Sequence, residues 1–205
     1  MVHILKTNKA YFDFQIAYMF YGFSFMSTRS VINIFYDKAL TLNYSSVGFY
    51  QNAYNIITIL LLPFFGKLIG NVDPRRFTII SFLSMAGYIL FTSLSAFFPL
   101  HFEILNLEIY LMLVIATLFF GLFNATIILS WNIGSSYFGP DEEAGDYQSI
   151  HLFATGVRGA VSPIIGVVLY ELFGFSWTFG IAVFMLLVAV FIMQWSYKNR
   201  KVLNF

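Results

Sequence analysis

Six long apolar runs, separated by short polar connections, follow one another along the chain. They cover residues 12–35, 47–69, 77–98, 107–137, 147–173 and 177–197. A helix needs about 20 mostly apolar residues to cross the hydrocarbon core of a membrane, and each run reaches that length. The strands of a membrane barrel would be about 10 residues long and would alternate apolar with polar positions. The pattern therefore predicts an all-α membrane protein, with six transmembrane helices forming one domain over residues 1–205.

Composition agrees with this class. Hydrophobic residues make up 59% of the chain and charged residues 10%, with a mean hydropathy of +0.77, whereas charged residues are about 25% of a soluble domain. The formal net charge of +1 gives no basic surface for nucleic acid, so membrane lipid is the expected environment and no nucleic-acid partner is predicted. The absence of cysteine excludes disulfides, thiolate metal sites and thiol catalysis.

Lysine and arginine in the connections predict how the helices are oriented. With six crossings, both chain ends lie on one side of the membrane, together with the second and fourth connections. Short cytoplasmic loops carry the excess of basic residues. One side collects Lys6, Lys9, Lys67, Arg75, Arg76, Lys198, Arg200 and Lys201, and the other side holds Lys38. We therefore predict a multi-pass protein of the cytoplasmic (inner) membrane with both termini in the cytoplasm.

The fifth run carries polar side chains where a helix in lipid should have none. At 100° per residue, one narrow stripe contains Gln148, His151, Thr155, Arg158 and Ser162. A cation at membrane depth costs roughly 2.5 to 3.5 kcal/mol on insertion scales, so Arg158 requires a partner or water. We predict that this helix lines a solute path, with Arg158 in contact with the solute and His151 nearby. A hydrogen-bonded packing role is the competing interpretation of His151.

Small residues flank this stripe. Gly156, Gly159, Pro163 and Gly166 follow one another at helical spacing beside the polar positions. Membrane helices pack closely where small residues let their backbones approach. We therefore predict that these four residues form a helix-packing face.

Polar residues also mark three other runs. Arg29 lies in the first run, Gln51 and Asn55 in the second, and Asn124 and Asn132 in the fourth. We predict that these five residues line the same path as the fifth run. Two alternatives remain open. The arginine could extend to the membrane interface, and the amides could bond neighbouring helices, which contributes about 1 kcal/mol.

The sequence gives no support for an intramembrane enzyme. It contains no His-Glu-x-x-His motif and no paired acids at membrane depth, and His151 by itself cannot form a metal or haem site. We therefore expect no metal, no cofactor and no enzymatic activity.

The connection after the second run resembles the loop signature of the major facilitator superfamily. It reads GKLIGNVDPRR over residues 66–76, and the positions that match the signature are Gly66, Leu68, Arg75 and Arg76. Asp73 stands where a second glycine is usual, and the acid and arginine of the signature are replaced by Gly70 and Asn71. These departures count against a salt-bridged cytoplasmic gate built on this loop.

The resemblance extends over essentially the whole chain. The entry at residues 5–12, the segment at 131–138, the acidic loop after it and the glycine-rich fifth run resemble, in that order, the C-terminal half of a bacterial major facilitator protein. The resemblance implies one six-helix repeat, half of a major facilitator fold. Its first, second, fourth and fifth helices would line a central path, and the third and sixth would pack outside.

The function that the resemblance implies is transport of a small, unidentified solute by rocking of two halves against each other. The second six-helix half would come from the same chain, from a homodimer or from a separate subunit. The alternative is a non-transporting membrane scaffold or an inactive transporter fragment.

Overall fold

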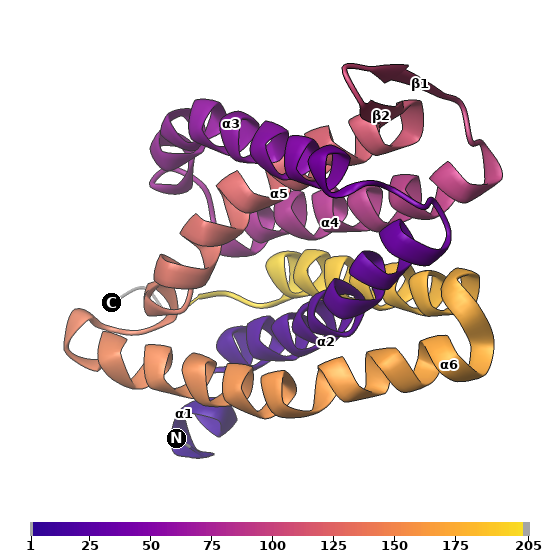
Figure 1. Ribbon diagram of the computed structural model, residues 1–205. Helices are drawn as coiled ribbons and strands as arrows, with labels where there is room; N and C mark the ends of the chain where they lie inside the picture. Colours follow the sequence, from indigo (N-terminus) through magenta and orange to yellow (C-terminus); the bar gives the residue numbers. More distant parts are fainter. Residues whose placement is uncertain (1, 203–205) are drawn as a thin grey trace.

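The computed structural model describes residues 2–202, and helices make up most of this part of the chain (Figure 1). The helices are α1 (Val2–Thr7), α2 (Lys9–Lys38), α3 (Tyr44–Ile69), α4 (Pro74–Phe97), α5 (Leu111–Ile133) and α6 (Ala144–Asn199). A hairpin of β1 (His101–Ile104) and β2 (Leu107–Tyr110) precedes α5, and two 3₁₀ turns, η1 (Ser136–Phe138) and η2 (Asp141–Glu143), precede α6. Apart from the hairpin, the predicted all-α class is confirmed.

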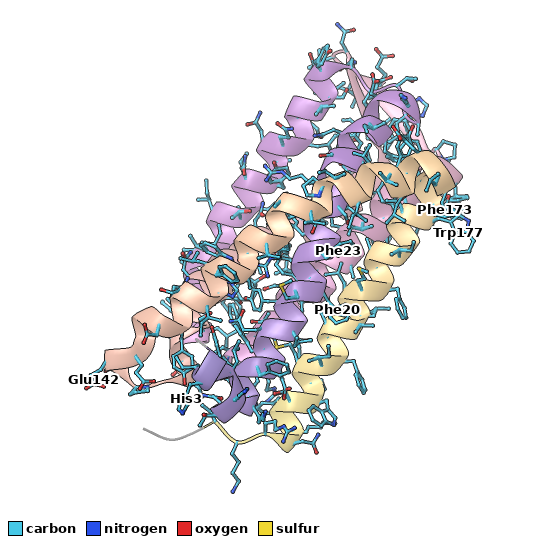
Figure 2. The ribbon with its side chains drawn as sticks, turned by 90° about the horizontal axis from the view of Figure 1, so that it is seen from below. His3, Phe20, Phe23, Glu142, Phe173 and Trp177 are labelled. Carbon is cyan, nitrogen blue, oxygen red and sulfur yellow. The ribbon has the colours of Figure 1, made fainter. Side chains whose placement is uncertain are left out.

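The helix α6 consists of two limbs that turn back on each other at Gly174. A straight helix of 56 residues would be about 84 Å long at 1.5 Å per residue, far more than the roughly 30 Å of a hydrocarbon core. Gly174 has φ 76° and ψ −177°, a conformation that is open to glycine because it has no Cβ. Figure 2 shows the chain reversing between Phe173 and Trp177. The reversal falls in the connection predicted between the fifth and sixth runs.

Four stretches of the described chain are long and apolar enough to cross a membrane. They are α3, α4, α5 and the residues Asp141–Asn199, which contain both limbs of α6. The helix α2 has 30 residues, which is sufficient length for one crossing, but Asp13, Arg29 and Asp37 lower its apolar character. The multi-pass membrane class is therefore supported, and the number of six crossings stays a prediction.

Side chains with an oxygen acceptor begin three of the long helices. Asn8, Asn43 and Asp73 directly precede α2, α3 and α4, and each side chain accepts a backbone N–H of the following turn at 2.8–3.0 Å. These caps satisfy donors that the first turn of a helix leaves without an intrahelical acceptor. The ends of the apolar runs are therefore fixed by local chemistry in the connections.

The hairpin replaces the helical start that the sequence predicts for the run 107–137. Its turn residues, Leu105 and Asn106, have φ of 53° and 61°, as in the type I′ turns that match the twist of paired strands. Residues 101–110 alternate largely between apolar and polar side chains, which is a strand period. Because this segment is also rich in apolar residues, its composition merges with that of the helix. The helix itself covers Leu111–Ile133.

The long helices form two groups. The helix α2 packs against α6, α5 packs against α3 and α4, and a contact between α4 and α6 joins the groups. In Figure 1, one end of the bundle carries both chain ends, the α3–α4 connection and the 3₁₀ turns, and the other carries the hairpin and the Gly174 turn. We call the end with the chain ends the terminal end and the end with the hairpin the hairpin end. In Figure 2, His3 and Glu142 lie at the terminal end, and Phe173 and Trp177 lie at the hairpin end.

The two limbs of α6 enclose α2 by different contacts. On the first limb, the His151 ring packs against Tyr18 with centroids 4.8 Å apart. On the second limb, the carbonyl of Ala182 accepts a hydrogen bond of 3.0 Å from Ser24. Since α2 is covered on both sides, several of its polar and aromatic side chains are buried, namely Tyr11, Tyr18, Tyr21, Ser24 and Ser27.

Candidate functional site

A cavity of about 390 Å³ lies between α2, α3, α4 and α5. Its lining comes from the second half of α2, the first half of α3 and the middle of α4 and α5, which places it between the middle of the bundle and the hairpin end. The volume lies within the roughly 300–1,000 Å³ typical of small-molecule sites. This cavity is the candidate solute site.

Polar side chains from three helices line the cavity. They are Arg29 and Asn33 from α2, Gln51 and Asn55 from α3, and Asn124 from α5. The two residues on α2, and the two on α3, are four positions apart, so each pair lies on one face of its helix. Four of the seven residues predicted for the path, namely Arg29, Gln51, Asn55 and Asn124, therefore meet at one cavity.

Aromatic side chains form much of the remaining lining. The Phe120 ring lies with its centroid 4.3 Å from that of Tyr88 and 4.7 Å from that of Tyr54, and the hydroxyls of Tyr36 and Tyr88 are 3.2 Å apart. Tyr88 and its neighbour in the lining, Met85, belong to α4. The third long helix thus contributes to the cavity, in contrast to the outside position that the family resemblance implies.

Arg158 lies outside this cavity, in the contact between α2 and the first limb of α6. Its side chain is almost fully buried, with 3% relative exposure. One guanidinium nitrogen donates to the carbonyl of Tyr18 at 2.8 Å, and another donates to the hydroxyl of Thr155 at 2.7 Å. The ion pairs found within residues 2–202 involve Arg75 and Arg200, so the acceptors that hold Arg158 are neutral groups of the same chain.

Gly22 provides the space that Arg158 occupies. A Cβ at position 22 would overlap the Arg158 side chain at Nε, Cδ and Cζ. The arginine therefore lies directly across the α2 backbone, and its approach depends on a residue without a side chain. The sequence shows Gly22 as one small residue in the first run, with nothing to indicate which side chain covers it.

His151 lies beside Arg158 in the same buried contact. Its Nδ1 is 3.2 Å from the Gln15 side-chain oxygen, and its ring packs against Tyr18 and, with centroids 5.7 Å apart, against Trp131. These contacts fit the packing interpretation of His151. Gln15, which lies four residues after Tyr11 on the buried face of α2, is a partner that the sequence reasoning missed.

A chain of aromatic rings lies between the cavity and the buried arginine. Phe25 lines the cavity and stacks on Tyr21, Tyr21 stacks on Phe82, and Phe82 contacts Tyr18, whose ring touches His151. Successive ring centroids are 4.8–5.9 Å apart. The polar residues predicted as one path are therefore divided into two sites with an aromatic layer between them.

Asn132 belongs to neither site. It lies near the C-terminal end of α5, toward the terminal end of the bundle, and its side chain is exposed. Its amide donates to the carbonyl of Ile128, one turn earlier, at 2.7 Å. The structure thus places Asn132 on the outer surface of the bundle, at the opposite end from the cavity.

The predicted helix-packing face is tight at Gly166 and loose elsewhere. A Cβ at Gly166 would overlap the backbone of Ser27, so α2 and α6 touch there. A Cβ at Gly159 would make only ordinary contact, with the nearest atom 3.7 Å away, and one at Gly156 would meet no atom within 4 Å. Pro163 is half-buried. Gly156 faces outward and meets no neighbouring helix of this chain, so its packing role stays a prediction.

The 66–76 connection ties α4 to the end of α6. Arg75 pairs with Asp73 at 2.7 Å and donates to the carbonyls of Ser196 and Arg200, both at 3.0 Å. Arg75 is buried, with 2% relative exposure. Because all of these partners belong to this chain, the contact holds the terminal end of the bundle together.

The other residues of the loop signature are more exposed. Gly66 and Arg76 are exposed and Leu68 is half-buried. The Arg76 guanidinium lies over the Tyr197 ring, 5.2 Å from its centroid, a cation–π arrangement. These side chains lie at the terminal end, away from the cavity.

A family profile described as Major Facilitator Superfamily matches residues 15–203. The chain belongs to this family. The match covers most of the chain and confirms the resemblance seen in the sequence, and it identifies a multi-pass membrane protein of a transporter family. Comparison with curated proteins and with solved structures finds no match.

For this major facilitator protein, the sequence reasoning missed several residues of the cavity. Asn33 and Tyr36 lie four and seven positions after Arg29, and Tyr54 lies three positions after Gln51. Helical spacing from the predicted residues could have found them. Tyr88 had no such signal, because it lies in a run without charged or amide residues near it. Within residues 2–202, no cluster of three or more acidic, histidine or cysteine side chains is placed to hold a metal ion.

Proposed function

We propose that this chain acts as one six-helix half of a major facilitator transporter and moves a small solute across the cytoplasmic membrane. The half is either a half-transporter or the C-terminal half of a longer transporter. The observation that carries the proposal is the cavity between α2, α3, α4 and α5, which combines Arg29 and four amides with an aromatic wall. Such a combination of apolar walls and a few polar groups is typical of small-molecule sites.

The exposed polar residues of three helices support a partner half. Arg29, Gln51 and Asn55 are exposed near the hairpin end, and Asn132 is exposed near the terminal end. Polar side chains facing lipid are costly, so we propose that these faces of α2, α3 and α5 face a second six-helix half and the aqueous path between the halves. Rocking of one repeat against the other would then expose the path to each side in turn.

The residues divide between contact and support in this proposal. Arg29, Gln51, Asn55 and Asn124 contact the solute, because they line the cavity. Arg158 is a positioning residue that joins α2 to the first limb of α6, and His151 supports it in the same contact. This assignment differs from the sequence-based hypothesis, in which Arg158 contacts the solute.

We propose that both termini lie in the cytoplasm and that the hairpin end faces the opposite side. The terminal end holds both chain ends and the α3–α4 connection (Figure 1), and these segments carry the basic residues counted in the sequence. Basic residues concentrate in short cytoplasmic loops. The cavity toward the hairpin end would then face away from the cytoplasm in this conformation.

The experiment that tests transport uses the absence of native cysteine. Asn55→Cys places a single thiol at the cavity, and a membrane-impermeant maleimide is added to right-side-out or inside-out vesicles. An alternating-access transporter is expected to be labelled from both sides, because the path opens to each in turn. Asn106→Cys in the hairpin turn and Asn199→Cys at the end of α6 are matched controls, each labelled from one side.

Labelling of Asn55→Cys from one side only would contradict rocking and favour a non-transporting scaffold. The two controls also determine the orientation, since Asn199→Cys should react from the cytoplasmic side. A second half supplied by an identical chain predicts a twofold dimer closed on the faces of α2, α3, α5 and the first limb of α6. Mass measurement in detergent that finds only monomer would exclude the homodimer.

A further inference from the structure

The part of the cavity that this chain lines carries one positive charge, which no acidic side chain among the described residues pairs with. Among the described residues that line it, Arg29 is the one with a formal charge. The side chain is exposed, and the ion pairs found within residues 2–202 are Arg75 with Asp73 and Arg200 with Asp13. The Arg29 guanidinium therefore has its donors available to a group in the cavity, unlike the guanidinium of Arg158.

The amides around this charge are also available to a ligand. The side chains of Asn33, Gln51, Asn55 and Asn124 make no hydrogen bond to another described residue that meets normal distance and angle limits. Each amide offers both donors and an acceptor. A solute with oxygen atoms could therefore be bound from α2, α3 and α5 at once.

The aromatic part of the lining favours a flat apolar group. Phe120 packs with Tyr54 and Tyr88, and Phe25 lines the same cavity. Aromatic pairs prefer offset or edge-to-face contacts with centroids 4.5–7 Å apart, so a planar group can join this cluster. The cavity thus offers a single cation, several amides and an aromatic surface within about 390 Å³.

We infer that the transported solute is a small organic monoanion whose carboxylate lies next to an aromatic or other flat apolar group, with Arg29 contacting the carboxylate. The planar guanidinium matches a carboxylate through two parallel hydrogen bonds. A single arginine balances one negative charge, so a monoanion suits the site better than a phosphate dianion. The amides would bind further oxygen atoms of the solute. This inference rests on the proposed function, because it names the solute class of the same cavity.

The test compares three probes that share one ring and differ in charge. Purified protein is titrated with benzoate, benzamide and benzylammonium, and binding is followed as the rise in Tm with concentration. Benzoate is expected to raise Tm, because a ligand that binds only the folded state stabilises it, and the neutral and cationic probes are expected to have little effect. Equal responses to benzoate and benzamide, or no response to any of the three, would overturn the inference.

Variants assign the effect to the cavity arginine. Arg29→Gln is expected to weaken benzoate binding at least about tenfold, as for loss of hydrogen bonds to a charged group, and Arg29→Lys should retain part of it. Lys38→Gln removes the same charge from the end of the same helix, outside the cavity lining, and should bind benzoate normally. Unchanged binding by Arg29→Gln would contradict the assignment.

The solute class and the transport function can fail separately. Labelling of Asn55→Cys from both sides without a benzoate preference would contradict the proposed solute class and still support transport. Benzoate binding that depends on Arg29, with labelling from one side only, would contradict the proposed transport and indicate an anion-binding membrane protein. Benzoate should also slow the labelling of Asn55→Cys if it occupies the cavity.

Discussion

Arg29 and Arg158 are two arginines within long apolar runs, and the fold gives them opposite surroundings. Arg29 lies on the exposed side of α2 and lines a cavity with four amides. Arg158 lies against the covered side of the same helix, bonded to the Tyr18 carbonyl and the Thr155 hydroxyl. A charged side chain at membrane depth is by default a functional candidate. The comparison shows that such a candidate can instead be held by hydrogen bonds within its own bundle, although the buried Nε of Arg158 has no partner among the described residues.

The surrounding residues reinforce this difference. Near Arg29, the amides lack protein partners among the described residues, and aromatic rings line the same cavity. Near Arg158, Gly22 leaves no room and His151 is bonded to Gln15. The first arrangement suits reversible binding of a solute, and the second suits a permanent contact between two helices.

The largest expected effect separates the two arginines by stability. Arg158→Ala should lower the free energy of unfolding by about 2–5 kcal/mol, the range for truncating a large buried side chain. Arg29→Ala should change it by less than about 0.5 kcal/mol, as for exposed positions. Reversible unfolding by steric trapping measures both. Equal losses would remove the distinction between a supporting and a solute-contacting arginine.

Arg158→Met sharpens this test, because it keeps most of the volume and removes the charge. Replacing a buried charge by an apolar side chain of similar size is often nearly neutral, so Arg158→Met should stay within about 1.5 kcal/mol of the native protein. If Arg158→Met folds normally and Asn55→Cys in that background is still labelled from both sides, the charge is not required for rocking. Loss of two-sided labelling in a stable Arg158→Met protein would support the sequence-based hypothesis that Arg158 acts in the solute path.

The second prediction concerns the close contact between α2 and α6 at Gly166 and Ser27. Gly166→Ala should destabilise the protein by about 1–3 kcal/mol, as overpacking does, because the added Cβ meets the Ser27 backbone. Gly156→Ala, ten residues earlier on the same helix, should be neutral or slightly stabilising, since alanine is the better helix former. Thermal unfolding in detergent compares the two. Similar Tm values would contradict the close contact at Gly166.

The third prediction tests the fit of Arg158 over Gly22. Gly22→Ala should destabilise the native protein by about 1 kcal/mol, and should have less effect when Arg158 is already alanine, because the arginine side chain is what the new Cβ meets. A double-mutant cycle measures the coupling, expected at about 0.5–3 kcal/mol for residues in contact. Additive effects of the two substitutions would show that the arginine does not lie across position 22.

The smallest expected effect is at the hairpin end, next to the cavity. Tyr50 lines the cavity, and its hydroxyl donates to the Glu108 carbonyl at 3.1 Å and accepts the Tyr110 N–H at 2.8 Å. Tyr50→Phe removes both bonds, each contributing about 0.5–1.5 kcal/mol, but the loss concerns local opening of the hairpin, so the free energy of global unfolding should change least among these variants. Hydrogen exchange at Tyr110 should become faster, while Tyr44→Phe, at a position 97% exposed, should leave it unchanged. Equal exchange in both variants would exclude the hydroxyl as the anchor of the hairpin.

The amino-acid sequence was sufficient to predict the helical membrane class, the family and the positions of most helices. These follow from local properties: the length of apolar runs, the caps at Asn43 and Asp73, and the glycine at position 174 that reverses the chain. The sequence did not predict the hairpin at residues 101–110, because its apolar residues are continuous with those of the next helix. Its alternation and the Leu105-Asn106 turn were the available signals.

The grouping of the polar residues into two sites could be established only from the packing of the helices. Helical spacing places Arg158 and His151 on one stripe and Arg29 and Asn33 on another, but spacing does not say which neighbouring helix covers a stripe. Packing of α2 against α6 buries the first stripe, and the open space beside α3 and α5 exposes the second. Burial depends on contacts between segments more than 100 residues apart, such as Tyr18 with Arg158, and such contacts are set by the whole fold.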